Sequence, residues 1–161
     1  MSTASAEAAE LQTLINDTFW TEKGHFVLAG WWRGAHLIVG LTATLAAGFA
    51  GATIIGRTNP ILPGVAALIA TLAGGVLTFL KPAEVANSHQ QTGRQLGALR
   101  VEMRQVLNLD APGSAGTPEL RAKIADLATK KAEIDQAALH VADLAMWWVD
   151  RRMKAGAYTS T

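Results

Sequence analysis

The sequence contains no cysteine, a single tyrosine and only 6% aromatic residues among its 161 positions. Without cysteine the chain can form neither a disulfide framework nor a zinc site built on thiolates, and it offers no thiolate nucleophile. A surplus of charge of one sign is also missing, because 14 lysines and arginines stand against 13 acidic residues. A nucleic-acid-binding protein needs a basic surplus on one face, so this class is not expected.

Charge is nearly absent from one long stretch. Residues 34–80 contain a single charged side chain, Arg57, while the rest of the chain holds 26 of the 27 charges. Uncharged segments at 34–56 and 61–80 each have about the 20 residues that cross a bilayer core. The short connection between them predicts an antiparallel transmembrane hairpin over 34–80. The alternative, a hairpin buried in a soluble bundle, needs more amphipathic chain to cover it than remains.

Each apolar segment is preceded by a boundary signal. Trp31 and Trp32 stand before the first segment, where an interfacial aromatic belt anchors a membrane helix. The start of the second segment stays open between two assignments. Asn59 can cap the helix with Pro60 at its first position, and Pro63 can equally mark the start.

Basic residues at the outer ends of the two segments predict the orientation. Only Arg57 lies in the connection, whereas five basic residues flank the outer ends: Lys23, Arg33, Lys81, Arg94 and Arg100. Because basic residues stay on the cytoplasmic side of a membrane, both termini are expected in the cytoplasm. The first 33 residues are acidic and have no basic start, unlike a secretory signal peptide.

Small residues recur at every fourth position along both segments. The ladder of the first segment is Gly40, Thr44, Gly48, Ala52 and Gly56, and Gly74 and Gly75 belong to similar ladders in the second. Such ladders let helix backbones approach closely, which drives helix association in lipid. One ladder can face the other helix of the same hairpin, and Ala47 and Gly51 then remain for another subunit. We therefore expect a homo-oligomer packed through these residues.

Ionisable side chains are missing from both segments apart from His36. This excludes a proton relay, an ion-coupled transporter and a voltage sensor, which need ionisable groups within the membrane. His36 is expected to make an interfacial or interhelical hydrogen bond rather than to act as a pH gate. Arg33, His36 and Lys81 are candidates for a pore mouth, where the two cations would attract anions. Alternatively, Arg33 and Lys81 only anchor to lipid headgroups.

The rest of the chain has the apolar spacing of helices. An amphipathic helix is expected within residues 1–33, and a cytoplasmic helical hairpin over 81–161 with a loop at 108–117. Four-three spacings define two coiled-coil seams; they run through Val85, His89, Thr92, Leu96, Leu99, Met103 and Val106, and through Leu120, Ile124, Leu127, Lys131, Ile134, Ala138, Val141, Ala145 and Trp148. The expected fold class is an all-α membrane protein with a two-helix transmembrane hairpin.

A tryptophan pair and a basic cluster lie near the end of the last expected helix, which starts at a Thr117 cap and runs to about Lys154. A helix over residues 83–107 would lead away from the membrane, and an equal length of the last helix would lead back to it. Trp147 and Trp148 would then lie at the membrane. There they would be interfacial anchors, with basic residues near headgroup phosphates: Arg151, Arg152 and Lys154. The alternative places Trp148 in the seam and Trp147 on a solvated face.

No constellation of catalytic or metal-binding residues stands out. His25, His89 and His140 lie in separate segments without the spacing of a helical metal-binding pair. His89, at a seam position, is expected to be a satisfied buried histidine rather than a ligand. The acidic residues are dispersed, and no nucleophile–base pair can be assigned. We expect no enzymatic activity, no cofactor and no metal.

Three short motifs in this order of parts resemble a known family. K-x-H-F begins at Lys23 and W-R-x-x-H-x-x-x-G at Trp32; after the hairpin, H-x-x-x-G-x-x-L-x-x-L begins at His89 and is followed by Arg104. Over about residues 8–153 the chain resembles the SLATT domain, a two-transmembrane effector domain associated with nucleotide second-messenger and SLOG sensor systems in bacteria. Leu96 departs from the tyrosine that family members favour there.

The resemblance implies a pore-forming or membrane-perturbing effector of the bacterial inner membrane, acting in defence or conflict systems. It implies a trigger in trans, from a sensor protein or a nucleotide-signalling partner, and it supplies no catalytic residue. The expected partners are membrane lipid, other copies of the chain and this trigger, with no nucleic acid. The rival functions are a membrane-anchored scaffold and a small subunit of a larger membrane complex, neither with a pore of its own.

Overall fold

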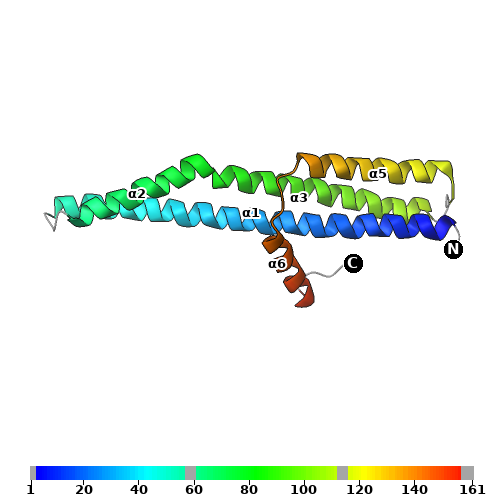
Figure 1. Cartoon of the computed structure of the whole chain (residues 1–161), viewed down its shortest axis with the longest axis horizontal. Helices are drawn as coiled ribbons and strands as arrows, with labels where there is room; N and C mark the ends of the chain where they lie inside the picture. Colours follow the sequence, from blue (N-terminus) through cyan, green and yellow to red (C-terminus); the bar gives the residue numbers. More distant parts are fainter. Residues whose placement is uncertain (1–2, 57–60, 112–115, 157–161) are drawn as a thin grey trace. The chain divides into compact units, whose positions relative to one another are not determined.

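Helices make up nearly all of the described structure. The computed structural model describes residues 3–56, 61–111 and 116–156, and no strand occurs within those ranges. In chain order the elements are α1 (Thr3–Ile55), α2 (Ile61–Leu80), α3 (Pro82–Gln105), the π-helix η1 (Val106–Asp110), α5 (Pro118–Ala137) and α6 (Asp143–Lys154) (Figure 1). The predicted all-helical fold is confirmed, and two of its helices are long and apolar enough to cross a membrane.

The chain divides into two compact units. We call residues 1–28 with 88–161 the bundle, and residues 29–87 the hairpin. The helix α1 contributes its first part to the bundle and its second part to the hairpin, and it runs without a break for 53 residues. The expected boundary at residue 33, between an amphipathic helix and a membrane span, therefore falls inside a continuous helix.

The bundle packs the first part of α1 with α3 and α5 around one apolar core (Figure 1). Both predicted seams are buried over most of their length. Leu96 and Met103 of α3 are 0% exposed, and Leu120 and Leu127 of α5 are 2% exposed. At about 1.5–3 kcal/mol for each large apolar side chain, this burial is the main force that holds the three helices together.

The connection between α3 and α5 differs in part from the prediction. The loop expected at 108–117 was wrong in its first four positions, because the helix continues as η1 to Asp110 and Ala111 is still helical. Val106, at the start of η1, is only 8% exposed, so core packing extends the helix through a segment whose composition favours a loop. Residues 112–115 lie outside the described residues. The predicted cap is confirmed, since Thr117 Oγ1 accepts a hydrogen bond from the Leu120 amide at 3.2 Å.

The single final helix expected from Pro118 to Lys154 was also wrong. The helix α5 ends at Ala137, and Ala138 has an extended conformation with φ −77° and ψ 150°. The helix resumes as α6 only at Asp143. The expected return of this helix to the membrane depended on one straight helix from Pro118 to Lys154, and it is therefore not supported.

A tertiary contact accounts for this break. Residues 138–142 contain neither proline nor glycine, so no local signal ends the helix. Val141 and Met146 instead pack onto α1 at Gly24, where a Cβ atom would lie 2.9 Å from each of the two side chains. Because glycine has no Cβ, both side chains reach the α1 backbone, and this packing overrides helix propensity.

The hairpin contains the two apolar helices, and α2 has the predicted bounds of residues 61–80. The first apolar segment, 34–56, ends one residue after α1 does. Residues 57–60, with Arg57 and the alternative caps Asn59 and Pro60, lie outside the described residues. Because α2 is already helical at Ile61, Pro63 is not its first residue.

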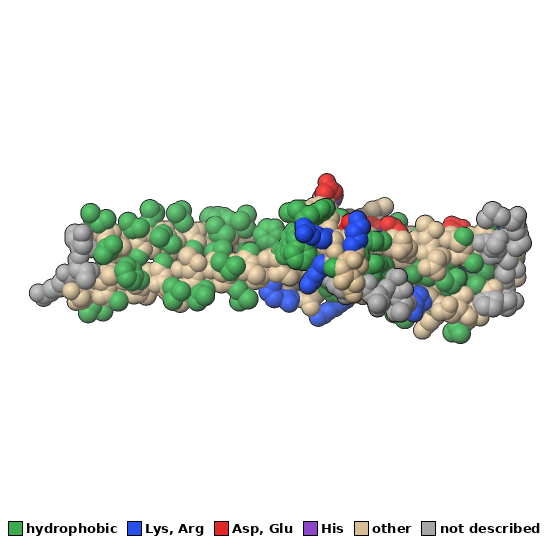
Figure 2. All heavy atoms as spheres, turned by 90° about the horizontal axis from the view of Figure 1, so that it is seen from below, with side chains coloured by type: hydrophobic (Ala, Val, Ile, Leu, Met, Phe, Trp, Pro, Cys, Tyr) green, Lys and Arg blue, Asp and Glu red, His purple; other side chains and the backbone are tan. Residues whose placement is uncertain are grey.

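The two helices of the hairpin meet through small side chains. Ala50 and Thr53 of α1 and Ala66 and Ala73 of α2 are at most 9% exposed. Most other side chains point outward, and only 11% of the most apolar 18-residue window of each helix is buried. The surface of the hairpin is accordingly covered with apolar side chains (Figure 2).

Candidate functional site

The small-residue ladder of α1 faces away from the other helix of its own hairpin. A Cβ atom at Gly48 would meet no atom within 4 Å, and the exposed members of the ladder are Thr44, Gly48, Ala52 and Gly56. Gly40 is the exception, because a Cβ there would lie 3.9 Å from Leu77 Cδ1 of α2. In α2, Gly74 and Gly75 are half-buried and also have open space around a Cβ.

The face that α1 uses inside the hairpin was not predicted from the sequence. That face follows four-three spacing, with half-buried or buried side chains at His36, Val39, Ala43, Ala46, Ala50 and Thr53. The same seam criterion that identified the bundle helices would have found it. A search for glycine ladders does not detect this spacing, because this face is built mainly of alanine.

The three pore-mouth candidates have different surroundings. Arg33 is exposed, and His36, one turn later, is half-buried. Within the described residues, the buried His36 Nδ1 has no hydrogen-bond partner. Lys81 lies between α2 and α3 in the left-handed conformation, with φ 44°, and its Nζ is 3.1 Å from Glu84 Oε1. This carboxylate beside the expected cation was not predicted from the sequence.

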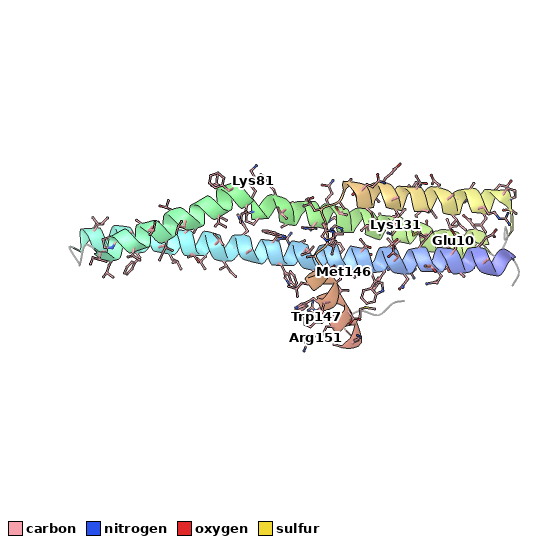
Figure 3. All side chains as sticks on the ribbon, viewed as in Figure 1. Glu10, Lys81, Lys131, Met146, Trp147 and Arg151 are labelled. Atoms are coloured by element: carbon pink, nitrogen blue, oxygen red, sulfur yellow. The ribbon has the colours of Figure 1, made fainter. Side chains whose placement is uncertain are left out.

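Three of the four expected interfacial tryptophans are exposed. Trp31 is 37% exposed and Trp32 is half-buried. Trp147 is 51% and Trp148 39% exposed, and Figure 3 shows Trp147 on α6 with Arg151. The buried positions of α6 are Ala145 and Val149. The alternative that placed Trp148 in the helix seam was therefore wrong.

Two histidines meet in the interior of the bundle. His25 of α1 and His89 of α3 are 1% and 3% exposed, and their Nδ1 atoms are 2.9 Å apart, so one donates and the other accepts. The expectation that His89 is buried and satisfied is confirmed. Its partner was missed because 64 residues separate the two positions, and no helical spacing connects them.

Acidification is expected to destabilise the bundle through this pair. Burial, and to a smaller extent nearby His89, lower the pKa of His25 to about 4, although Asp135 partly opposes the shift; burial also lowers the pKa of His89. The unfolded chain binds protons below about pH 6.5 while folded His25 stays neutral, so stability is complete above that pH and falls as the pH decreases toward 4. For His25 the loss is about 2 kcal/mol between about pH 7.5 and pH 5.

Urea unfolding of the detergent-solubilised protein at the two pH values measures this loss. His25→Gln should reduce the pH dependence, because the amide does not titrate. His140→Gln changes an exposed histidine and should leave the dependence intact. Equal stability of the wild-type protein at both pH values would contradict the assignment.

A buried carboxylate lies a few residues before the histidine pair. Glu22 is 4% exposed, and its two oxygens accept hydrogen bonds from Lys23 Nζ and Arg100 Nε, both at 2.8 Å. The Arg100 guanidinium also lies 5.2 Å from the centroid of the Phe19 ring. This cluster joins α1 to α3, and no spacing within either helix predicts it.

The bundle has two open grooves beside η1. One, of about 290 Å³, is lined by Ile15, Phe19, Leu107, Gln12, Asn16, Arg100, Arg104 and Asn108. The second, of about 310 Å³, shares Arg104 and Asn108 and adds the exposed side chains Val101 and Leu109. Across the described ranges, no three histidine or acidic side chains are grouped so that they could hold a metal ion.

Together, the fold and these surfaces define a class: an all-helical protein with two apolar helices long enough to cross a membrane and a packed helical bundle. Comparisons with known proteins give no match to a family model, a curated protein or a solved structure. The resemblance to the SLATT domain therefore stays a prediction.

Proposed function

We propose that the protein crosses a bacterial inner membrane twice, through α1 from about residue 34 and through α2, and assembles with its own copies into a pore or membrane-perturbing complex. Both termini are then cytoplasmic. The observation that carries the proposal is the outward-facing ladder around Gly48 in the uncharged part of α1, which begins at residue 34.

Exposed apolar side chains on the hairpin support insertion into lipid. Leu37, Leu41 and Phe49 of α1 are 64%, 61% and 52% exposed, and Leu68 and Leu72 of α2 are 60% and 63% exposed. Soluble monomers rarely expose contiguous apolar patches larger than a few hundred Å². Lipid contacts would remove this surface from water.

The hydroxyl groups of the hairpin are compatible with the same environment. A bilayer core offers no water, so each polar group needs a partner within the protein. Four exposed threonines donate to the carbonyl oxygen four residues earlier in their own helix, each at 2.9 Å: Thr42, Thr44, Thr71 and Thr78. Their hydroxyls therefore do not oppose insertion.

Small residues on an outward face favour association between hairpins. The alanine contacts already join α1 to α2, so the Gly48 side of α1 remains for a neighbouring copy. Close backbone approach is the main attraction between helices in lipid, where no hydrophobic effect operates.

A passive pore fits the chemistry of the hairpin better than a transporter does. Neither apolar segment, 34–56 or 61–80, contains Asp, Glu or Lys, so a path between copies would be apolar with scattered threonines and would conduct by wetting. Following the SLATT resemblance, we assign it the role of an effector that a partner triggers in trans. We propose no enzymatic activity.

A membrane-anchored scaffold is the second candidate. The observation that favours it is the pair of grooves beside η1, where Val101 is 53% and Leu109 74% exposed. A partner protein bound there would use the hairpin only as an anchor.

Flux from liposomes separates the two candidates. The purified protein is reconstituted without partners, and efflux of potassium, chloride and a small dye is recorded. A pore releases ions in proportion to the protein added, whereas a scaffold leaves the vesicles as tight as empty controls. No flux at any protein density would contradict the pore.

Ion selectivity is expected to depend on the pair of Lys81 and Glu84. The two side chains are 59% and 69% exposed and form an ion pair, so a ring of Lys81 charges is partly neutralised. Glu84→Gln removes the neutralising carboxylate and should raise the chloride-to-potassium permeability ratio by about two- to fivefold, whereas Lys81→Glu should reverse the preference. Reversal potentials in a salt gradient measure this ratio.

Glu119→Gln, at the start of α5, is the matched control and should leave the ratio unchanged. A strongly cation-selective wild-type conductance would exclude a ring of cations at the mouth. Headgroup anchoring by Arg33 and Lys81 would then be the remaining role.

A further inference from the structure

The helix α6 is amphipathic and is held by one side only. Ala145 and Val149 are 0% exposed, and Met146 contacts α1 at Gly24. Among its other apolar side chains, Leu144 is 61%, Trp147 51% and Trp148 39% exposed. In Figure 3, Met146 lies at the end of α6 next to α1, and Trp147 and Arg151 lie further along the helix.

Each exposed indole has a guanidinium group over it. Arg151 Cζ lies 5.4 Å from the ring centroid of Trp147, and Arg152 Cζ lies 5.3 Å from that of Trp148. Lys154 pairs with Asp150 at 2.6 Å. No salt bridge of Arg151 or Arg152 occurs within the described residues, so their charge is not neutralised by a carboxylate there.

Indole and guanidinium groups side by side match the chemistry of a phospholipid surface. Tryptophan prefers the boundary between hydrocarbon and water, because its ring is apolar and its N–H needs a polar partner. Arginine binds phosphate through two parallel N–H donors, and it keeps this capacity while stacked on an aromatic ring. Indoles at the acyl boundary would place the two guanidinium groups at the depth of the headgroup phosphates.

We propose that α6 is a docking helix for anionic phospholipid, with Trp147 and Trp148 in the interface and Arg151 and Arg152 on headgroup phosphates. The surface lies outside the two apolar helices, and its assignment does not depend on pore activity. The net positive charge of the last turn selects anionic over zwitterionic lipid, because each basic residue near an anionic surface strengthens binding by about fivefold.

Fluorescence quenching by brominated lipid tests the proposal on the full chain. Trp20, Trp31 and Trp32 are replaced by Phe, which leaves Trp147 and Trp148 as the only tryptophans. The protein is reconstituted in vesicles of phosphatidylcholine with and without one quarter phosphatidylglycerol. We expect lipid brominated near the headgroup to quench by about half or more with phosphatidylglycerol present, and less without it.

Matched charge variants test the role of the arginines. Arg151→Gln with Arg152→Gln should reduce the quenching several-fold, whereas Arg94→Gln with Arg104→Gln removes two exposed cations of α3 and should change nothing. If the triple Phe variant misfolds, Trp147→Phe with Trp148→Phe in the wild-type background should instead reduce the quenching by brominated lipid and leave only the part that arises from the other tryptophans.

Three outcomes would overturn the proposal. Quenching only by aqueous iodide would leave α6 in water, and protection from both quenchers would indicate a protein partner. Quenching that is equal in both kinds of vesicle, and unchanged when Arg151 and Arg152 are replaced, would show that these arginines do not bind headgroup phosphates. Because these readouts do not use flux, lipid contact without flux would refute only the proposed pore.

Discussion

Replacing Gly48 with leucine is expected to break the assembled protein into single hairpins while both apolar helices remain in the membrane. The position faces away from α2 with open space around its Cβ, so the larger side chain does not disturb the hairpin itself. It separates the backbones of neighbouring copies, and the van der Waals contact that drives association in lipid is lost. We expect a change from oligomer to monomer and a loss of flux of tenfold or more.

Chromatography with light scattering in mild detergent measures the assembly, and carbonate extraction of membranes measures insertion. Thr42→Leu is the matched control, because it adds a leucine to an exposed position about 120° around the same helix. An intact oligomer in Gly48→Leu would show that the Gly48 face does not form the interface between copies. An equal loss of the oligomer in Thr42→Leu would show the same.

Replacing Glu22 with glutamine is expected to destabilise the bundle strongly. The side chain of Glu22 is 5% exposed, and those of Lys23 and Arg100 are 20% exposed, so both cations would lose their carboxylate in a poorly hydrated place. Removing one partner of a buried ion pair costs about 3–5 kcal/mol. Because the two cations are partly exposed, we expect Glu22→Gln to lower the free energy of unfolding by about 2–4 kcal/mol.

Urea unfolding monitored by circular dichroism measures the loss in the full chain. Glu102→Gln serves as control, because Glu102 pairs with Lys130 at 3.0 Å but both side chains are over 40% exposed. Such a surface pair contributes about 0–1 kcal/mol. Equal effects of the two substitutions would show that the Glu22 cluster is not a buried ion pair.

The apolar pattern predicted those parts of the fold that depend on local spacing. The bounds of α2 follow from a run of uncharged residues ended by Lys81 and Pro82. The burial of Leu96, Met103 and Leu127 follows from four-three spacing. In each case the information lies within one or two helical turns, where side-chain periodicity reports the buried face directly.

The features that were missed depend on residues far apart in the chain. The break after α5 results from contacts with Gly24, more than 100 residues earlier, and no residue in 138–142 signals it. The pairing of His25 with His89 likewise depends on the register between α1 and α3. Periodicity identifies a buried face but does not specify which side chains meet across it.

The direction in which the Gly48 ladder faces was left open by the sequence. The spacing of small residues was recognised, but spacing alone does not say which of two small faces packs inside the hairpin. Ala50, Ala66 and Ala73 form the contact between α1 and α2, and the glycine face lies on the outside of the hairpin. The proposed assembly rests on this difference.

The mass of the wild-type complex in mild detergent tests the central claim most directly. Native mass spectrometry counts the chains in each particle without reference to flux or to a partner. We expect one dominant species, at a fixed multiple of the chain mass and of at least three copies, as a closed ring around a pore requires. A protein that stays monomeric in detergent at every concentration, up to the concentration that it reaches within the membrane, would contradict the proposed assembly.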